Sequence, residues 1–239
     1  MTRFRPWQTA LSGLFFPPHC AVCERALSAG ALICAGCAAG VRRVELPRCG
    51  VCSHPFDGVA GEMECSNCRG HEFYFDTAVS VMRCVGSVRD LLHRFKYGRE
   101  RYLRRILGEW LAEALDDPRL ADVKPDVLVP VPLHPARLRE RQFNQAFELS
   151  EWVTRLRGVP TRQVLGRKRY TTTQTRFDRE RRMQNLRDAF VLRQNADVTN
   201  NHILLVDDIL TTGSTLDECG RVLLEAGAAS VNAITVARG

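Results

Sequence analysis

Four Cys-x-x-Cys pairs in the first 70 residues constrain this chain more than any other feature of its sequence. The pairs are Cys20/Cys23, Cys34/Cys37, Cys49/Cys52 and Cys65/Cys68. The segments between them are rich in turn-forming residues and hold little aliphatic sequence with which to build a core. Repeated Cys-x-x-Cys is typical of tetrahedral zinc sites, in which metal ligation supplies folding free energy. The alternative is a disulfide framework of the kind found in secreted domains, but nothing else in the sequence indicates secretion.

The spacing of the pairs predicts two compact zinc ribbons. Ten residues separate the first two pairs and twelve separate the last two, so each ribbon would use four consecutive cysteines. An interleaved arrangement, first pair with third and second with fourth, is the alternative. Zinc bound by four thiolates has no open coordination position, so both metals are predicted to be structural. His19, His54 and His71 lie beside the ligands and are expected not to bind zinc.

The cysteines also bear on the compartment. Reduced thiols indicate a cytoplasmic protein, and no membrane insertion is expected because no apolar run reaches ~18 residues. Basic residues before the apolar stretch 11–16 faintly resemble a signal peptide, but that stretch is short. Pro17 and Pro18 also stand where a small-residue cleavage site would be needed. Trp7, Leu11 and Leu14 have helical spacing, which predicts a short amphipathic helix at the N-terminus.

From about residue 73 the pattern changes to alternating strands and helices. The predicted strands are 73–81, 126–131, 202–206 and 230–236, and the predicted helices begin near 87, 101, 145 and 215. Such alternation favours a mostly parallel sheet flanked by helices, and the aliphatic run Ile203–Val206 fits a strand buried on both faces. We therefore predict an α/β domain over residues 73–239, preceded by a zinc-ribbon module with four-cysteine sites over residues 1–72.

A phosphate-binding segment follows the buried strand at 202–206. Asp207 and Asp208 come first, and the small-residue loop follows with Thr211, Thr212, Gly213, Ser214 and Thr215. Ligands of open parallel sheets bind beyond the carboxyl ends of the strands, where backbone N–H groups and a helix N-terminus attract phosphate. The two carboxylates suit ribose hydroxyls, directly or through Mg²⁺. The alternative is an ordinary strand–turn–helix connection, each part of which is common alone.

This segment resembles the diphosphoribosyl-binding motif of the type I phosphoribosyltransferases. The resemblance implies that Asp207 and Asp208 bind the ribose hydroxyls with Mg²⁺, and that 211–215 surrounds the 5-phosphate of 5-phosphoribosyl diphosphate or a related ribose phosphate. Purine-salvage members of the superfamily carry an aspartate where Thr211 stands here, and it serves the purine as base or hydrogen-bond partner. Thr211 cannot do this, so purine salvage is not expected.

Further anion-binding candidates lie elsewhere in the second region. A rigid loop is expected at Pro130, Val131 and Pro132, where the superfamily binds diphosphate. The alternative is an ordinary edge turn. The other candidates are basic residues, for which a solvated surface position is the alternative: Lys96, Arg137, Arg141 and Arg182. Arg182 belongs to the basic segment 167–182, which we interpret as the mobile loop that covers the site in phosphoribosyltransferases.

Several of these segments together resemble the ComF family, which includes competence proteins and the related GntX group. Arg141–Gln145 is similar to the family's Arg-Gly-Phe-Asn-Gln signature, with Gln142 in place of glycine. If that position needs a positive φ, Gln142 is strained. The resemblance covers almost the whole chain, including the cysteine pairs. It implies a role in handling single-stranded DNA during natural transformation, together with other DNA-uptake proteins.

The charge distribution adds an anionic partner to this interpretation. Residues 155–193 hold twelve Lys/Arg and three Asp/Glu, a local excess of +9 that exceeds the formal charge of +7 for the chain. The ribbon region is not basic: residues 1–75 hold seven Lys/Arg against six Asp/Glu, and two zinc–thiolate sites would make it acidic. Any DNA contact is therefore expected on the second domain.

Three functions follow from these observations. The first is a phosphoribosyltransferase of nucleotide metabolism with an unidentified acceptor, and the second is a competence protein that uses the ribose site as a ligand or regulatory site. The two are compatible. The third is a zinc-organised scaffold with a vestigial site, against which Asp207, Asp208 and Gly213 argue because all three are intact. The sequence identifies the ligand better than it identifies a reaction.

Overall fold

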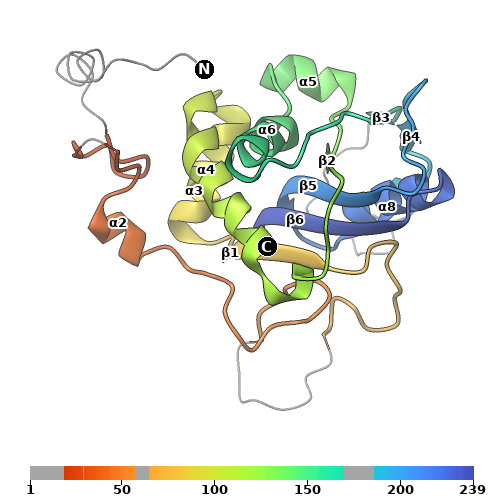
Figure 1. Cartoon of the computed structure of the whole chain (residues 1–239). Coiled ribbons are helices and arrows are strands. Elements are labelled where there is room, and N and C mark those ends of the chain that lie inside the picture. Colours follow the sequence, from red (N-terminus) through yellow and green to blue (C-terminus); the bar gives the residue numbers. More distant parts are fainter. Residues whose placement is uncertain (1–18, 29, 57–64, 170–185) are drawn as a thin grey trace.

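A parallel sheet forms the centre of the molecule (Figure 1). The computed structural model describes residues 19–28, 30–56, 65–169 and 186–239. The sheet holds the strands in the order β1-β6-β5-β2, with every neighbouring pair parallel. Their bounds are β1 Ala78–Arg83, β2 Val127–Pro130, β5 His202–Leu210 and β6 Ser230–Arg238. Beyond β2, Thr161 forms one further parallel bridge with Leu128.

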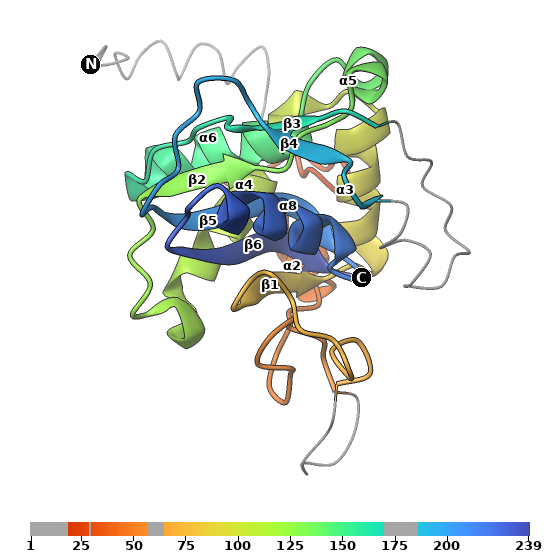
Figure 2. The same cartoon turned by 90° about the vertical axis from the view of Figure 1, so that its right-hand side faces the viewer.

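Helices cover both faces of this sheet. One face carries α3 (Gly86–Tyr97), α4 (Arg104–Ala112) and α6 (Gln145–Arg157), and the other carries α8 (Ser214–Glu225) (Figure 2). The shorter elements are α2 Ala35–Ala39, α5 Pro135–Arg141, the 3-10 turns η1 Arg101–Leu103, η2 Glu113–Asp116 and η3 Pro118–Leu120, and the hairpin β3 Leu165–Arg167 with β4 Phe190–Leu192. This confirms the predicted fold class, a parallel sheet flanked by helices.

The aliphatic strand β5 divides its side chains between two hydrophobic clusters. Leu204 and Val206 face the cluster of α3, α4 and α6, whereas Ile203 and Leu205 face the cluster of α8. Successive side chains of a strand point to opposite faces, so a strand covered on both sides needs an unbroken apolar run. The prediction of burial on both faces is confirmed.

Several element boundaries differ from the sequence prediction. The strand expected at 73–81 is β1 at Ala78–Arg83, because the chain before it leaves the sheet to pack against α8. The strand expected at 202–206 continues to Leu210, so the two acidic residues lie in the strand and not in the connection after it. Helix α5 and the β3–β4 hairpin were not predicted. The expected N-terminal helix lies outside the described residues.

Residues 42–51, which connect the two cysteine groups and enter the second, cover the outer edge of β1. Val44 N donates to Val81 O at 2.8 Å, Arg83 N donates to Arg42 O at 2.7 Å, and Ala78 N donates to Val51 O at 2.7 Å. Three backbone groups of β1 on the side away from β6 are thereby paired. The second cysteine group is thus joined to the sheet by main-chain hydrogen bonds.

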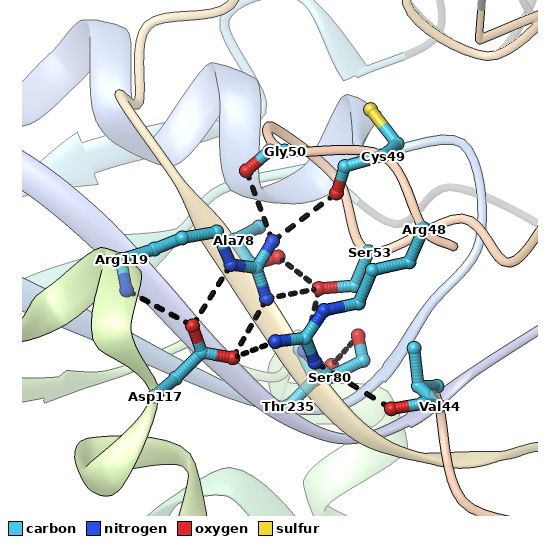
Figure 3. Close-up of polar contacts among 10 residues, drawn as sticks. All are labelled: Val44, Arg48, Cys49, Gly50, Ser53, Ala78, Ser80, Asp117, Arg119 and Thr235. Carbon is cyan, nitrogen blue, oxygen red and sulfur yellow. Dashed lines mark hydrogen bonds and ion pairs between the residues drawn. The ribbon is translucent and has the colours of Figure 1, made fainter. Parts of the chain in front are cut away.

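Arg119 reinforces this junction from the η3 turn (Figure 3). Its guanidinium donates to Gly50 O at 2.9 Å, to Cys49 O at 3.2 Å and to Ser53 Oγ at 3.0 Å. Asp117 holds that guanidinium at 2.9 Å and Arg48 at 2.7 Å. The turn at Cys49–Cys52 is therefore fixed to the second part of the chain by an ionic network around the buried Asp117.

No helix of the described part combines the length and the apolar character needed to cross a membrane.

Candidate functional site

Asp207 and Asp208 lie near the carboxyl end of β5, whose neighbours in the sheet are β6 and β2. Asp208 is 6% exposed, and its Oδ2 lies 2.9 Å from Lys96 Nζ in the last turn of α3. Asp207 accepts a hydrogen bond of 2.8 Å from the backbone N–H of Asp208. Because consecutive residues of a strand alternate, the two carboxylates leave the sheet on opposite faces at the same edge.

Burial raises the pKa of the Asp207 carboxyl to about 7, and the neighbouring charge of Asp208 adds to this shift. Lys96 and Arg167 act in the opposite direction. Removing a carboxylate from water disfavours its charged form, and a second carboxylate nearby does the same. A cation bound beside either carboxylate would oppose both effects, and carboxylate oxygens are ligands that hard divalent cations prefer.

The loop 211–213 leads directly from β5 into α8. Gly213 has φ +88° and precedes the first helical residue, Ser214, which is buried. A Cβ at Gly213 would lie 2.9 Å from Cε1 of Phe73, so both the backbone and the space require glycine. Thr212 Oγ1 lies 2.9 Å from Ser214 Oγ and accepts from Ser214 N at 3.4 Å. Hydroxyls and the N-terminus of α8 thus meet at the carboxyl edge of the sheet, where an anion is favoured.

The segment Pro130–Pro132 lies beside this edge because β2 is the neighbour of β5. Val131 N donates to Val206 O at 2.9 Å, one residue before Asp207. Asn144 Nδ2 donates to Val131 O at 3.0 Å, and Asn144 Oδ1 accepts from Ala146 N at the start of α6. One side chain therefore holds the Pro-x-Pro segment and caps a helix, in agreement with the prediction that a helix starts there.

Arg141, the last residue of α5, is buried beside the turn between α5 and α6. It donates to Gln145 Oε1 at 3.0 Å and to Tyr97 OH at 3.2 Å, and its guanidinium lies 5.0 Å from the centre of the Tyr97 ring. Gln142 caps α5 with φ +70°, so the condition under which Gln142 would be strained is met. Since Tyr97 follows Lys96, the turn and the acidic pair are joined through the end of α3.

Arg167, on β3, is a site residue that the sequence analysis did not single out. Burial lowers the pKa of its guanidinium, and the nearby charges of Arg137 and Arg141 add to the shift, whereas Asp207 raises it. The guanidinium stacks over Phe190 at 5.2 Å. Arg137 and Arg141 thus share the electrostatic environment of Arg167, and Arg167 in turn acts on Asp207. In the sequence, the only feature that indicated Arg167 was its place at the start of the basic segment 167–182. Arg182 lies outside the described residues.

The cysteines form two groups of four, in the sequential order that the spacing predicts. Cys20, Cys23, Cys34 and Cys37 form the first group, and Cys49, Cys52, Cys65 and Cys68 form the second. Within each group the sulfur atoms all lie within 4.8 Å of one another, and the histidines beside them are not members. The interleaved alternative is therefore wrong.

The donor sets fit tetrahedral zinc. Sulfur atoms bound about 2.3 Å from zinc lie about 3.8 Å apart in a tetrahedron. The measured Sγ–Sγ distances are 3.8 Å for Cys23–Cys34, 3.7 Å for Cys49–Cys68 and 3.6 Å for Cys52–Cys65. Four cysteines fill the coordination sphere, so the chemistry of each group is structural.

Two protein-family models match most of the chain. The double zinc ribbon domain matches residues 11–69, and the phosphoribosyl transferase domain matches residues 98–239. Competence protein F of Haemophilus influenzae is 31% identical over 86% of this chain and 90% of its own length. DNA utilization protein YhgH of Salmonella typhimurium is 33% identical, over 91% of this chain and 96% of its own. Competence protein ComFC of Streptococcus pneumoniae is 26% identical, over 80% and 87%.

Similar solved structures include a purine phosphoribosyltransferase from Pyrococcus horikoshii. The alignment covers 54% of this chain and 67% of that protein, with 20% identity and a TM-score of 0.31.

Proposed function

The chain belongs to the ComF family of proteins that join a double zinc ribbon to a phosphoribosyl transferase domain, and from this we propose that it binds 5-phosphoribosyl diphosphate with Mg²⁺. The observation that carries the proposal is the continuous stretch from Asp207 to Ser214. It combines two carboxylates at the end of a buried strand, a glycine with φ +88° and the N-terminus of a 12-residue helix.

Each part of the ligand has a matching group in the proposed site. The loop Thr211–Thr215 would bind the 5-phosphate through N–H groups and hydroxyls. Asp207 and Asp208 would bind the ribose hydroxyls and Mg²⁺, whose preferred ligands are carboxylate oxygens. The diphosphate would lie toward Pro130–Pro132, with positive charge from Arg137, Arg141, Lys96 and, in the basic segment, Arg182.

The position of Thr211 bears on the reaction. A threonine hydroxyl does not serve as general base near neutral pH, so this residue supplies no group for activating a purine. Transfer to some other acceptor is the second candidate function, supported by the phosphoribosyl transferase domain itself. Its test is release of diphosphate from the ligand in the presence of Mg²⁺ and a panel of nitrogen nucleophiles.

We place the protein in the cytoplasmic handling of single-stranded DNA during natural transformation. Relatives named for competence and for DNA utilization cover nearly the whole chain. The +9 excess of residues 155–193 adds an electrostatic attraction for phosphates. Single-stranded DNA affinity should then fall as salt rises, and an affinity independent of salt would exclude a groove that follows the phosphate backbone.

The ligand proposal is tested by calorimetry with 5-phosphoribosyl diphosphate, with and without Mg²⁺. Wild type should bind, and Asp207→Ala/Asp208→Ala should not. The matched control is Asp116→Ala/Asp122→Ala, which removes the same charge from two exposed residues in the connection to the amino end of β2, at the opposite edge of the sheet. No binding by wild type would exclude the proposed function. Binding retained by the first variant would exclude the site.

A further inference from the structure

The segment that leaves the second cysteine group runs along α8. His71 N donates to Cys68 O at 3.0 Å, and the His71 Nε2 lies 3.2 Å from Asp217 Oδ2 in the first turn of α8. Tyr74 N donates to the other oxygen of Asp217 at 2.7 Å. A single carboxylate of α8 therefore holds this segment at two points, three and six residues after a cysteine of the group.

Gly213, which caps α8, and Gly220 within the helix let this segment approach closely. A Cβ at Gly213 would lie 2.9 Å from Phe73, and a Cβ at Gly220 would lie 2.2 Å from Tyr74 O. Gly213, Asp217 and Gly220 are spaced by four and three residues, so they share one face of the helix. The segment 71–75 thus fixes the first two turns of α8 against the second cysteine group.

The other side of the loop 211–213 is held by the same group through Arg238. This buried arginine donates to Cys52 O at 3.1 Å and to Leu210 O at 3.0 Å. Leu210 is the last residue of β5 and directly precedes the loop. The Cys49–Cys52 turn is therefore bound through Arg238 to Leu210, the residue before the loop. The chain that follows Cys68 is bound to Asp217 of α8, which comes after the loop.

The first cysteine group has a different position. Its apolar side chains Ala21, Leu32 and Ile33 pack against the cluster of α3 and α4, and Arg94 of α3 donates to Ala21 O at 2.6 Å. The two groups are alike in donor set, but they differ in their relation to the loop 211–213. Within the described residues, the second group alone is linked by hydrogen bonds to both sides of that loop.

We propose that the second cysteine group, Cys49, Cys52, Cys65 and Cys68, positions the phosphate-binding loop. His71 and Arg238 are its positioning residues. The inference rests on the proposed function for the identity of the ligand, but the coupling itself is a property of the protein alone. Zinc bound to the four thiolates would hold the two Cys-x-x-Cys turns at a fixed separation, and the loop between Leu210 and Asp217 takes its geometry from that separation.

The test compares His71→Ala, His71→Gln and wild type as full-length protein with measured zinc content. Glutamine places an amide nitrogen close to where Nε2 lies, so it can still donate to Asp217. The control is His19→Ala, since His19 is exposed and lies beside a cysteine of the first group. Amide hydrogen exchange of residues 208–220 is measured without ligand, and affinity for ribose 5-phosphate is measured by calorimetry.

His71→Ala should exchange faster over residues 208–220 at unchanged zinc content, and its affinity should fall about tenfold, which corresponds to about 1.4 kcal/mol. His71→Gln should recover much of both, and His19→Ala should match wild type. Unchanged exchange in His71→Ala would overturn the inference. If wild type fails to bind ribose 5-phosphate and 5-phosphoribosyl diphosphate while His71→Ala still exchanges faster, the proposed function fails and the positioning role stands.

Discussion

Lys96 Nζ lies 2.9 Å from Asp208 Oδ2, so an ammonium group is paired with this carboxylate. Both side chains are largely buried, at 18% and 8% exposure. A strand residue and the end of a helix are thereby joined at the candidate site. Binding of Mg²⁺ to Asp208 would compete with this ion pair, and the released Lys96 would be available to the diphosphate.

Replacement of Lys96 by methionine should destabilise the protein in the absence of divalent cation. Removing one partner of a buried ion pair leaves an uncompensated charge and costs about 3 kcal/mol. Millimolar Mg²⁺ should restore part of this loss, because the cation can neutralise Asp208 in place of the ammonium. Urea unfolding with and without MgCl₂ measures both effects. A loss of stability that Mg²⁺ leaves untouched would argue against metal binding at Asp208.

The raised pKa of Asp207 predicts two opposite pH dependences. The folded carboxyl titrates near pH 7 and the unfolded one near its ordinary value of 3.8. Between these values the folded state binds more protons, so the contribution of Asp207 to stability is fully present below pH 3.8 and falls as pH rises toward 7. Mg²⁺ affinity should instead rise through pH 7, because only the ionised carboxyl binds the metal. Asp207→Asn should remove both effects in urea titrations and calorimetry from pH 5 to pH 8.

Gly213→Ala should weaken both the fold and ligand binding. A left-handed backbone costs an alanine about 1–2 kcal/mol, and the added methyl would meet Phe73 at 2.9 Å. Thermal unfolding and calorimetry with 5-phosphoribosyl diphosphate measure the two losses. Gly36→Ala is the control, because a Cβ there meets nothing within 4 Å. Equal behaviour of the two variants would show that the loop tolerates a shift of its backbone.

Gln142→Gly should stabilise the protein. Gln142 has φ +70°, and relieving a left-handed non-glycine residue gains about 1–2 kcal/mol, from which the greater entropy of glycine in the unfolded chain removes about 0.5–1 kcal/mol. The variant also loses the hydrogen bond from Gln142 Nε2 to Arg139 O, which is exposed. The midpoint of urea unfolding should therefore rise slightly. A lower midpoint would mean that the side chain itself holds the turn.

Arg119→Ala should release zinc faster from the second cysteine group. The substitution removes the guanidinium that holds Cys49 O, Gly50 O and Ser53 Oγ, and it leaves the buried Asp117 with one cationic partner fewer. Release to a coloured chelator should accelerate at least about tenfold for one zinc ion per chain, because breaking a buried pair costs more than the 1.4 kcal/mol that a factor of ten represents. Glu113→Ala, which breaks an exposed pair with Arg43, should not change the rate.

The sequence predicted the features that depend on local pattern. Helical spacing identified the buried face of α3, with Val88, Leu91, Leu92 and Phe95, and cysteine spacing identified the two groups. The family signature raised a positive φ at Gln142 only as a condition, and the structure has φ +70° there. In each case the interactions that fix the structure lie within fewer than 20 residues of one another along the chain.

Local sequence patterns could not predict contacts between segments that are distant along the chain. Nothing near Lys96 in the sequence indicates Asp208, and Arg238 reads as a terminal arginine although it lies buried between Cys52 O and Leu210 O. The β5 strand also continues through two aspartates, residues that seldom favour strands, because β6 pairs with it as far as Leu210. Tertiary hydrogen bonds decided each of these points.

The backbone pairing between residues 42–51 and β1 also affects how this chain meets other chains. An uncovered outer strand offers a row of unsatisfied N–H and C=O groups to which any extended peptide can add. Here residues 42–51 occupy that row at Val81, Arg83 and Ala78. The second domain prepared without residues 1–72 would expose unpaired N–H and C=O groups along the outer edge of β1. Self-association through that edge is then expected.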